Sequence, residues 1–231
     1  MIVSISSLTV LSQLQILPGA RMSCLPRVAR AALSSAEHDC LVLVASKPSG
    51  PHPALAAALQ PALQLDQAAE AGGCVVGVSL PAGRLVYSPT GPLDRDYDDL
   101  RRFTDAGAAG VKRAVAAGAK RPLVVVEGEL PGGNKEEAEL AALLGALQAL
   151  YTPLEMREAV AEKTLKVSEL GWAGAESVLQ RALAIERGRI VARDVGGSDP
   201  ERMAAPRVEE YVREAFKGDK KMIVFREDIL I

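Results

Sequence analysis

The chain has 231 residues, of which 48% are hydrophobic and 24% are charged, and its formal net charge is −2. This length and balance are typical of a soluble globular protein of one or two domains. The sequence holds no basic run that would favour nucleic acid, and its longest apolar runs, such as 41–45 and 123–126, are too short to span a membrane.

The three cysteines are widely spaced and form no CxxC pair, which argues against a disulfide framework or a structural zinc site. Free, buried thiols at Cys24, Cys40 and Cys74 fit a reducing compartment. We therefore expect a cytoplasmic protein without membrane contact.

Residues 1–17 alternate and carry β-branched side chains, which favours a strand. A mitochondrial transit peptide is the minor alternative, because three arginines and no acidic residue precede Glu37. Pro18-Gly19 interrupts the amphipathic pattern that such a peptide needs.

The next elements follow one another at short intervals. The patterns predict, in chain order, a short helix at 27–33, a buried strand at 40–45, a helix at 53–65, a second buried strand at 73–80 and a hairpin-paired strand at 84–87.

A helix is expected over 94–117, and its start is acidic, with carboxylates at Asp94, Asp96, Asp98 and Asp99. A metal site is one interpretation. Complementing the positive end of the helix dipole is the interpretation we prefer. Glycines within the buried stripe of this helix predict a close approach to the sheet.

The apolar run at 123–126 is the clearest strand of the chain, and it leads through a glycine-containing loop into a helix at 135–150. Such an arrangement cradles phosphates in some proteins. Here no phosphate-binding motif occurs, and Glu127 and Glu129 would repel an anion, so we favour a plain crossover loop. The alternation predicts an α/β fold with a mixed, mostly parallel sheet and helices on both faces.

Residues 151–170 are polar, which predicts a surface helix or the edge of the domain. We expect the domain boundary next to Trp172. A long helix is expected at 175–195, followed by Gly196-Gly197 as its stop and by the capping residues Ser198 and Asp199. An amphipathic helix follows Pro206, and 222–225 predicts one more strand.

The joint between these last two helices resembles the leucine (cytosol) aminopeptidase family, in a divergent branch. The resemblance rests on Ala192-Arg193-Asp194, a turn, two prolines at Pro200 and Pro206, and the amphipathic helix, and it is most specific from 172 to 216. The usual Asn-Thr-Pro of the joint is replaced here by residues 196–200. The resemblance implies a macro-domain-like N-terminal domain at 1–170, a linking helix at 171–195 and the start of a truncated catalytic domain at 196–231.

The family resemblance implies a metallo-aminopeptidase, a hydrolase that uses two divalent ions, zinc or manganese, to remove N-terminal residues from peptides. The catalytic signature of the family, Asn-Thr-Asp-Ala-Glu-Gly-Arg, is missing from the sequence. No catalytic, metal-binding or ligand-binding residue is therefore assigned, and the chain is expected to be inactive alone. His38 and His52 are the only histidines, and we interpret His38 as a surface loop residue.

Two hypotheses follow. In the first, the chain is the non-catalytic portion of an exopeptidase and meets a peptide substrate only in a full-length form. In the second, it is a stand-alone interaction or nucleotide-binding module, or a subunit that joins full-length copies. Nucleotide binding is considered because macro domains, which the resemblance implies for the N-terminal domain, bind ADP-ribose. The apolar tail at 218–231 predicts a homo-oligomer or co-assembly with full-length subunits.

Overall fold

The computed structural model describes residues 24–48, 52–128, 133–160 and 165–217. The strands expected at 1–17 and 222–225, and the apolar tail, lie outside these ranges and stay predictions. Among the described residues, no helix is both long enough and apolar enough to cross a membrane.

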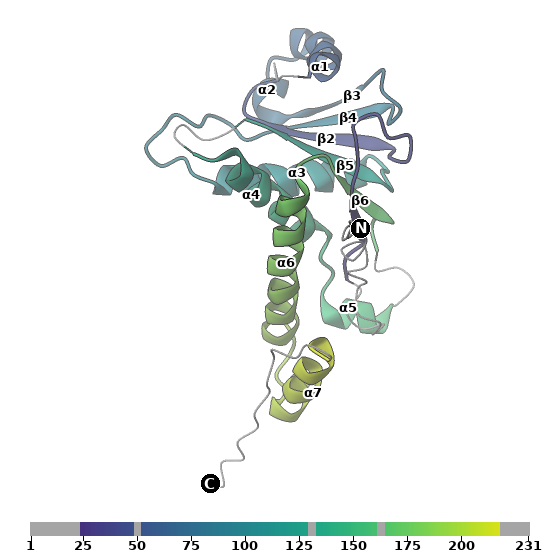
Figure 1. The fold of residues 1–231 in the computed structure, drawn as a ribbon, viewed down its shortest axis with the longest axis vertical. Helices are drawn as coiled ribbons and strands as arrows, with labels where there is room; N and C mark the ends of the chain where they lie inside the picture. Colours follow the sequence, from purple (N-terminus) through teal and green to yellow (C-terminus); the bar gives the residue numbers. More distant parts are fainter. Residues whose placement is uncertain (1–23, 49–51, 129–132, 161–164, 218–231) are drawn as a thin grey trace, which may run out of the picture.

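The described residues form strands and helices in close alternation (Figure 1). They are β1 (Arg27–Arg30), β2 (Cys40–Ala45), α1 (Pro53–Leu65), α2 (Ala69–Gly72), β3 (Cys74–Gly77), β4 (Arg84–Pro89), α3 (Arg101–Ala116), β5 (Pro122–Glu127), α4 (Lys135–Leu150), α5 (Leu154–Ala159), β6 (Glu169–Trp172), α6 (Glu176–Gly196) and α7 (Ala205–Ala215).

The strands make one sheet in the order β1-β6-β5-β2-β4-β3. Every neighbouring pair is parallel except β3 and β4, which are antiparallel. The predicted α/β fold with a mixed, mostly parallel sheet is thus confirmed. The helix expected at 27–33 is wrong, because Arg27–Arg30 pairs with Glu169–Trp172 as the edge strand β1.

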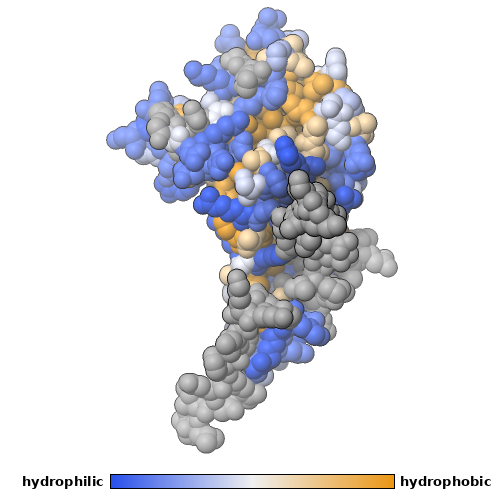
Figure 2. Space-filling model, in the orientation of Figure 1, coloured by the Kyte–Doolittle hydropathy of each residue, from blue (hydrophilic) through white to orange (hydrophobic). Residues whose placement is uncertain are grey.

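Helices cover both faces of the sheet, α1 and α2 on one side and α3 and α4 on the other (Figure 1). Since side chains alternate along a strand, Leu123 and Val125 of β5 face the α1 side, whereas Val124 and Val126 face α3 and α4. Burial on both faces explains why β2 is a continuous apolar run, buried at every position. Hydrophobic atoms remain visible over the sheet near α1 and β3 (Figure 2).

Glycines let α3 lie close to its neighbours, as the sequence predicted. A Cβ on Gly110 would lie 2.6 Å from Val42 Cγ1 of the sheet. A Cβ on Gly107 would overlap the carbonyl oxygen of Ala142 in α4, and one on Gly145 of α4 would overlap that of Thr104. These two helices therefore cross with their backbones in contact.

Two predicted features differ in detail. The strand predicted at 73–80 is shorter and only half-buried, because β3 is the edge strand beside β4. Helix α3 starts at Arg101 and has no acidic residue in its first turn. Asp98 instead binds Arg95 and Arg102 in ion pairs of 2.8 and 3.1 Å, and Asp99 binds Arg101 at 2.7 Å.

Helix α6 leaves the sheet and carries α7 at its far end (Figure 1). It packs against α4 near the sheet, while Met203, Tyr211 and Ala215 form a separate small core with Leu154 of α5. Strand β6 ends at Trp172, so the sheet continues two residues past position 170. Trp172 itself is fully buried in the main core. The division into domains at 170 and 195 stays a prediction.

Candidate functional site

The carboxylate of Asp194, on α6, joins side chains from three other segments of the chain. It is only 1% exposed. Tyr151, just after α4, donates to Asp194 Oδ1 at 2.7 Å. Arg157 of α5 and Tyr211 of α7 each donate to Oδ2 at 2.5 Å. One carboxylate thus ties α7 to α5 and to the end of α4, and we call these four residues the Asp194 network.

The electrostatics of the Asp194 network favour one protonation state. Burial, together with the hydrogen bond to the Asp194 carboxylate, raises the pKa of Tyr151 and of Tyr211 well above the usual value. The hydrogen bond and charge of Asp194 raise the pKa of Arg157, outweighing the opposing effect of its burial. At neutral pH both phenols therefore act as hydrogen-bond donors, and the network is a structural clamp.

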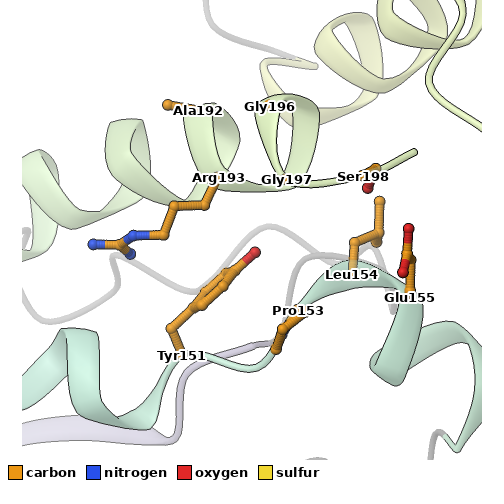
Figure 3. A pocket seen from close by; sticks show the side chains of 9 residues that line it. All are labelled: Tyr151, Pro153, Leu154, Glu155, Ala192, Arg193, Gly196, Gly197 and Ser198. Carbon is orange, nitrogen blue, oxygen red and sulfur yellow. The ribbon is translucent and has the colours of Figure 1, made fainter. Parts of the chain in front are cut away.

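A cavity of about 550 Å³ lies beside this network, between the loop after α4 and the end of α6 (Figure 3). Pro153, Leu154, Ala192 and Gly196 give it mostly apolar walls. The guanidinium of Arg193 lies 5.1 Å from the centre of the Tyr151 ring, a cation–π arrangement. Its own counterion is Glu186, at 2.6 Å.

The joint matches the prediction in part: α6 ends at Gly196 as expected, but neither glycine adopts the positive φ that was expected to stop the helix, and Gly197 has a φ of −97°. Ser198 Oγ donates to the Asp194 carbonyl at 2.8 Å, so it closes the end of α6. Asp199 Oδ1 accepts the backbone N–H of Arg202 at 2.9 Å and begins the turn that leads to α7.

A second polar group lies at the carboxyl edge of the sheet, where β5 ends with Glu127. This residue is 5% exposed, and neither carboxylate oxygen has a hydrogen-bond partner among the described residues. Its Oε1 lies 3.7 Å from Nε2 of His52, at the start of α1. Burial raises the pKa of Glu127, while His52 and Lys135 oppose that rise.

His38 is not the surface residue that the sequence suggested. It is 3% exposed, because its ring packs on the backbone of Gly171, where any side chain would collide with it. Its Nδ1 lies 3.3 Å from Ser35 Oγ. Burial lowers the pKa of His38.

The cysteines behave as the sequence predicted. Cys24 and Cys40 are buried free thiols, and Cys74 is partly buried. Burial raises the pKa of Cys24 and Cys40 to about 11, so neither is a ready nucleophile.

Within the described ranges, no group of three or more His, Cys, Asp or Glu side chains is placed to hold a metal ion. These residues therefore do not fit a two-metal centre. In the acidic run, the Asp98 carboxylate is already paired with Arg95 and Arg102.

The chain is similar in sequence to a protein named as an aminopeptidase. No model of a known protein family matches it. The Caenorhabditis elegans protein named "Putative aminopeptidase W07G4.4" is 41% identical over 159 residues, which is 66% of this chain and 30% of that protein. By sequence the chain is therefore a divergent relative of part of an aminopeptidase-like protein.

Solved structures share the fold of this aminopeptidase-like domain. The manganese complex of the bottromycin maturation enzyme BotP matches with a TM-score of 0.57 and 17% identity, over 76% of this chain and 35% of BotP. A tomato leucine aminopeptidase mutant matches with a TM-score of 0.57 and 16% identity, over 83% of this chain and 42% of that enzyme. The likeness to a macrodomain of Oceanobacillus iheyensis is weaker, with a TM-score of 0.48.

The aminopeptidase-like domain thus spans about a third of the length of these relatives. In the sequence, Asp194 was noted only as part of the joint, and nothing linked it to Tyr151, Arg157 and Tyr211, which come from three other segments. Only the polar side chains on otherwise apolar helix faces, such as Tyr211 between Val208 and Val212, signalled such a contact.

Proposed function

We propose that the chain is the N-terminal, non-catalytic portion of a metal-dependent leucyl-aminopeptidase-like exopeptidase. The observation that carries this proposal is the 41% identity to an aminopeptidase relative of which the matched region makes up only 30%. The zinc or manganese ions and the peptide bond cleavage then belong to the remainder of such a protein.

The acidic residues of the described chain support a structural role. Asp98, Glu169 and Asp194 are each held by arginines, with the Glu169 to Arg121 distance at 3.0 Å. A carboxylate held in this way is a poor metal ligand, because binding an ion would break its pairing. These side chains stabilise the fold and the position of α7.

Assembly is the role that the shape favours. Helix α6 projects from the sheet and α7 is fixed at its far end by the Asp194 network (Figure 1). We propose that the chain contributes a rigid mount for the catalytic portion, either in one polypeptide or by joining full-length subunits in a homo-oligomer.

The test measures mass and activity in one sample. An antibody against the segment around Tyr97, which is 63% exposed, precipitates the endogenous protein. We expect a species well above 24.3 kDa that hydrolyses leucine 7-amido-4-methylcoumarin and loses activity with a chelator. The purified 231-residue chain should be inactive with added zinc or manganese. A single inactive species at 24.3 kDa would refute the exopeptidase proposal and leave the interaction module.

A further inference from the structure

The connections of the sheet reverse direction between its two central strands. From β2 the chain continues to β3 and β4 on one side, whereas from β5 it continues to β6 on the other. In open α/β sheets such a switch point leaves a crevice at the carboxyl ends of the two strands, and ligands commonly bind there.

Glu127 is the last residue of β5, directly opposite Ala45, the last residue of β2. Alternation places it on the same face as Leu123 and Val125, under α1. Its buried carboxylate is therefore located at the switch point.

This carboxylate has an ion-pair contact with His52 but lacks, within the described part of the chain, the hydrogen bonds that a buried charge requires. Both oxygens are buried without a hydrogen-bond partner among the described residues. His52 is at 3.7 Å, and its backbone N–H lies near the carboxylate without reaching hydrogen-bond geometry. Lys135, the other nearby cation, pairs with Glu139 at 3.7 Å. A carboxylate that is buried without hydrogen bonds is unfavourable, and a cationic N–H donor would supply them.

The backbone beside Glu127 also has a special geometry. Gly128 has a φ of 100°, in the region that favours glycine. A Cβ there would lie 3.1 Å from Ser46 Oγ, so the chain turns away from the sheet in close contact with the end of β2.

We propose that Glu127, where the carboxyl ends of β2 and β5 lie side by side, binds an organic ammonium group, such as the N-terminus of a peptide or a free amine. An anion is disfavoured at the same place, because the carboxylate would repel it. This binding site does not depend on the proposed exopeptidase function.

The test is an NMR titration of the ¹⁵N-labelled full chain at pH 7, observing the backbone amide of Gly128. Leucinamide should shift this signal saturably, whereas N-acetyl-leucinamide, which lacks the ammonium group, should not. Methylammonium distinguishes a peptide N-terminus from a free amine. If methylammonium also shifts the Gly128 signal, the site accepts free amines; if it does not, the site is restricted to peptide-like ligands.

Two variants complete the experiment. Glu127→Gln should weaken leucinamide binding by about tenfold or more, because a charge-assisted hydrogen bond is lost. Glu169→Gln, a buried glutamate at the opposite edge of the sheet, should leave the affinity within about twofold. Lowering the pH should weaken binding, because burial raises the pKa of Glu127 and its carboxylate takes up a proton more readily.

Three results would overturn the proposal. They are no saturable shift with either ammonium compound, equal binding of the acetylated compound, and equal weakening by both variants. The first would mean that Glu127 serves only to complement the positive N-terminal end of α1.

Discussion

Replacing Asp194 by asparagine should destabilise the chain strongly. The substitution keeps the side-chain shape but removes the counterion of Arg157, which is 8% exposed. Arg157 would keep its bond to the Thr152 carbonyl, but its charge would be buried without the Asp194 carboxylate. Breaking a buried ion pair from one side typically destabilises by about 3–5 kcal/mol. That loss is a large fraction of the total stability of about 5–15 kcal/mol expected for a domain.

The assay is urea unfolding followed by circular dichroism. With an m-value of about 2–3 kcal/mol per molar urea, the midpoint should fall by about 1–2.5 M. Asp105→Asn is the matched control, since Asp105 is exposed on α3, and it should change stability by less than about 0.5 kcal/mol. In an Arg157→Met background, Asp194→Asn should be much less destabilising, because the positive charge that the Asp194 carboxylate neutralises is no longer present. A loss below about 1 kcal/mol, or the same loss in both backgrounds, would refute the assigned role of Asp194.

Three further predictions concern single side chains. Gly107→Ala should destabilise the chain by about 1–3 kcal/mol, because its Cβ would overlap α4. Gly188→Ala should instead stabilise α6 by about 0.5–1 kcal/mol, because a Cβ at this position meets open space. Thermal unfolding distinguishes the two variants. The pKa of Tyr211 is raised in the folded chain, which therefore holds the phenol proton of Tyr211 more tightly than the unfolded chain does. The free energy of unfolding should thus fall as the pH rises above the usual tyrosine pKa of about 10. Absorbance at 295 nm should show that the Tyr211 phenol is still protonated at pH 10.5. In the folded chain a thiol reagent should label Cys74 before Cys40, and equal rates would contradict the described burial.

Elements that depend on local patterns were predictable from the sequence. The apolar run of β5 and the periodic helix α4 were predicted within one residue of their observed bounds. The joint after α6 was also predicted, because glycine and the short polar side chains of Ser198 and Asp199 act on backbone groups within four residues of themselves.

Features that depend on distant partners were not predictable in this way. The four residues of β1 become a strand because they pair with β6, and nothing local distinguishes them from a short helix. His38 lies between Glu37 and Asp39, which suggests a surface loop, yet the space that Gly171 leaves allows its ring to be buried. The partners of Asp194 and the isolation of Glu127 are properties of packed elements, and no residue spacing encodes them.

The position of β1 has a consequence for how the chain folds during synthesis. Its partner, β6, begins at Glu169, whereas β1 begins at Arg27, so the ribosome must complete more than half of the chain before this edge can pair. At about 5–20 residues per second, the central strands have several seconds to assemble before β6 emerges. We expect the sheet to grow outward from β2, with β1 the last strand to join, and chains ending before Trp172 to expose the unpaired edge of β5 to aggregation.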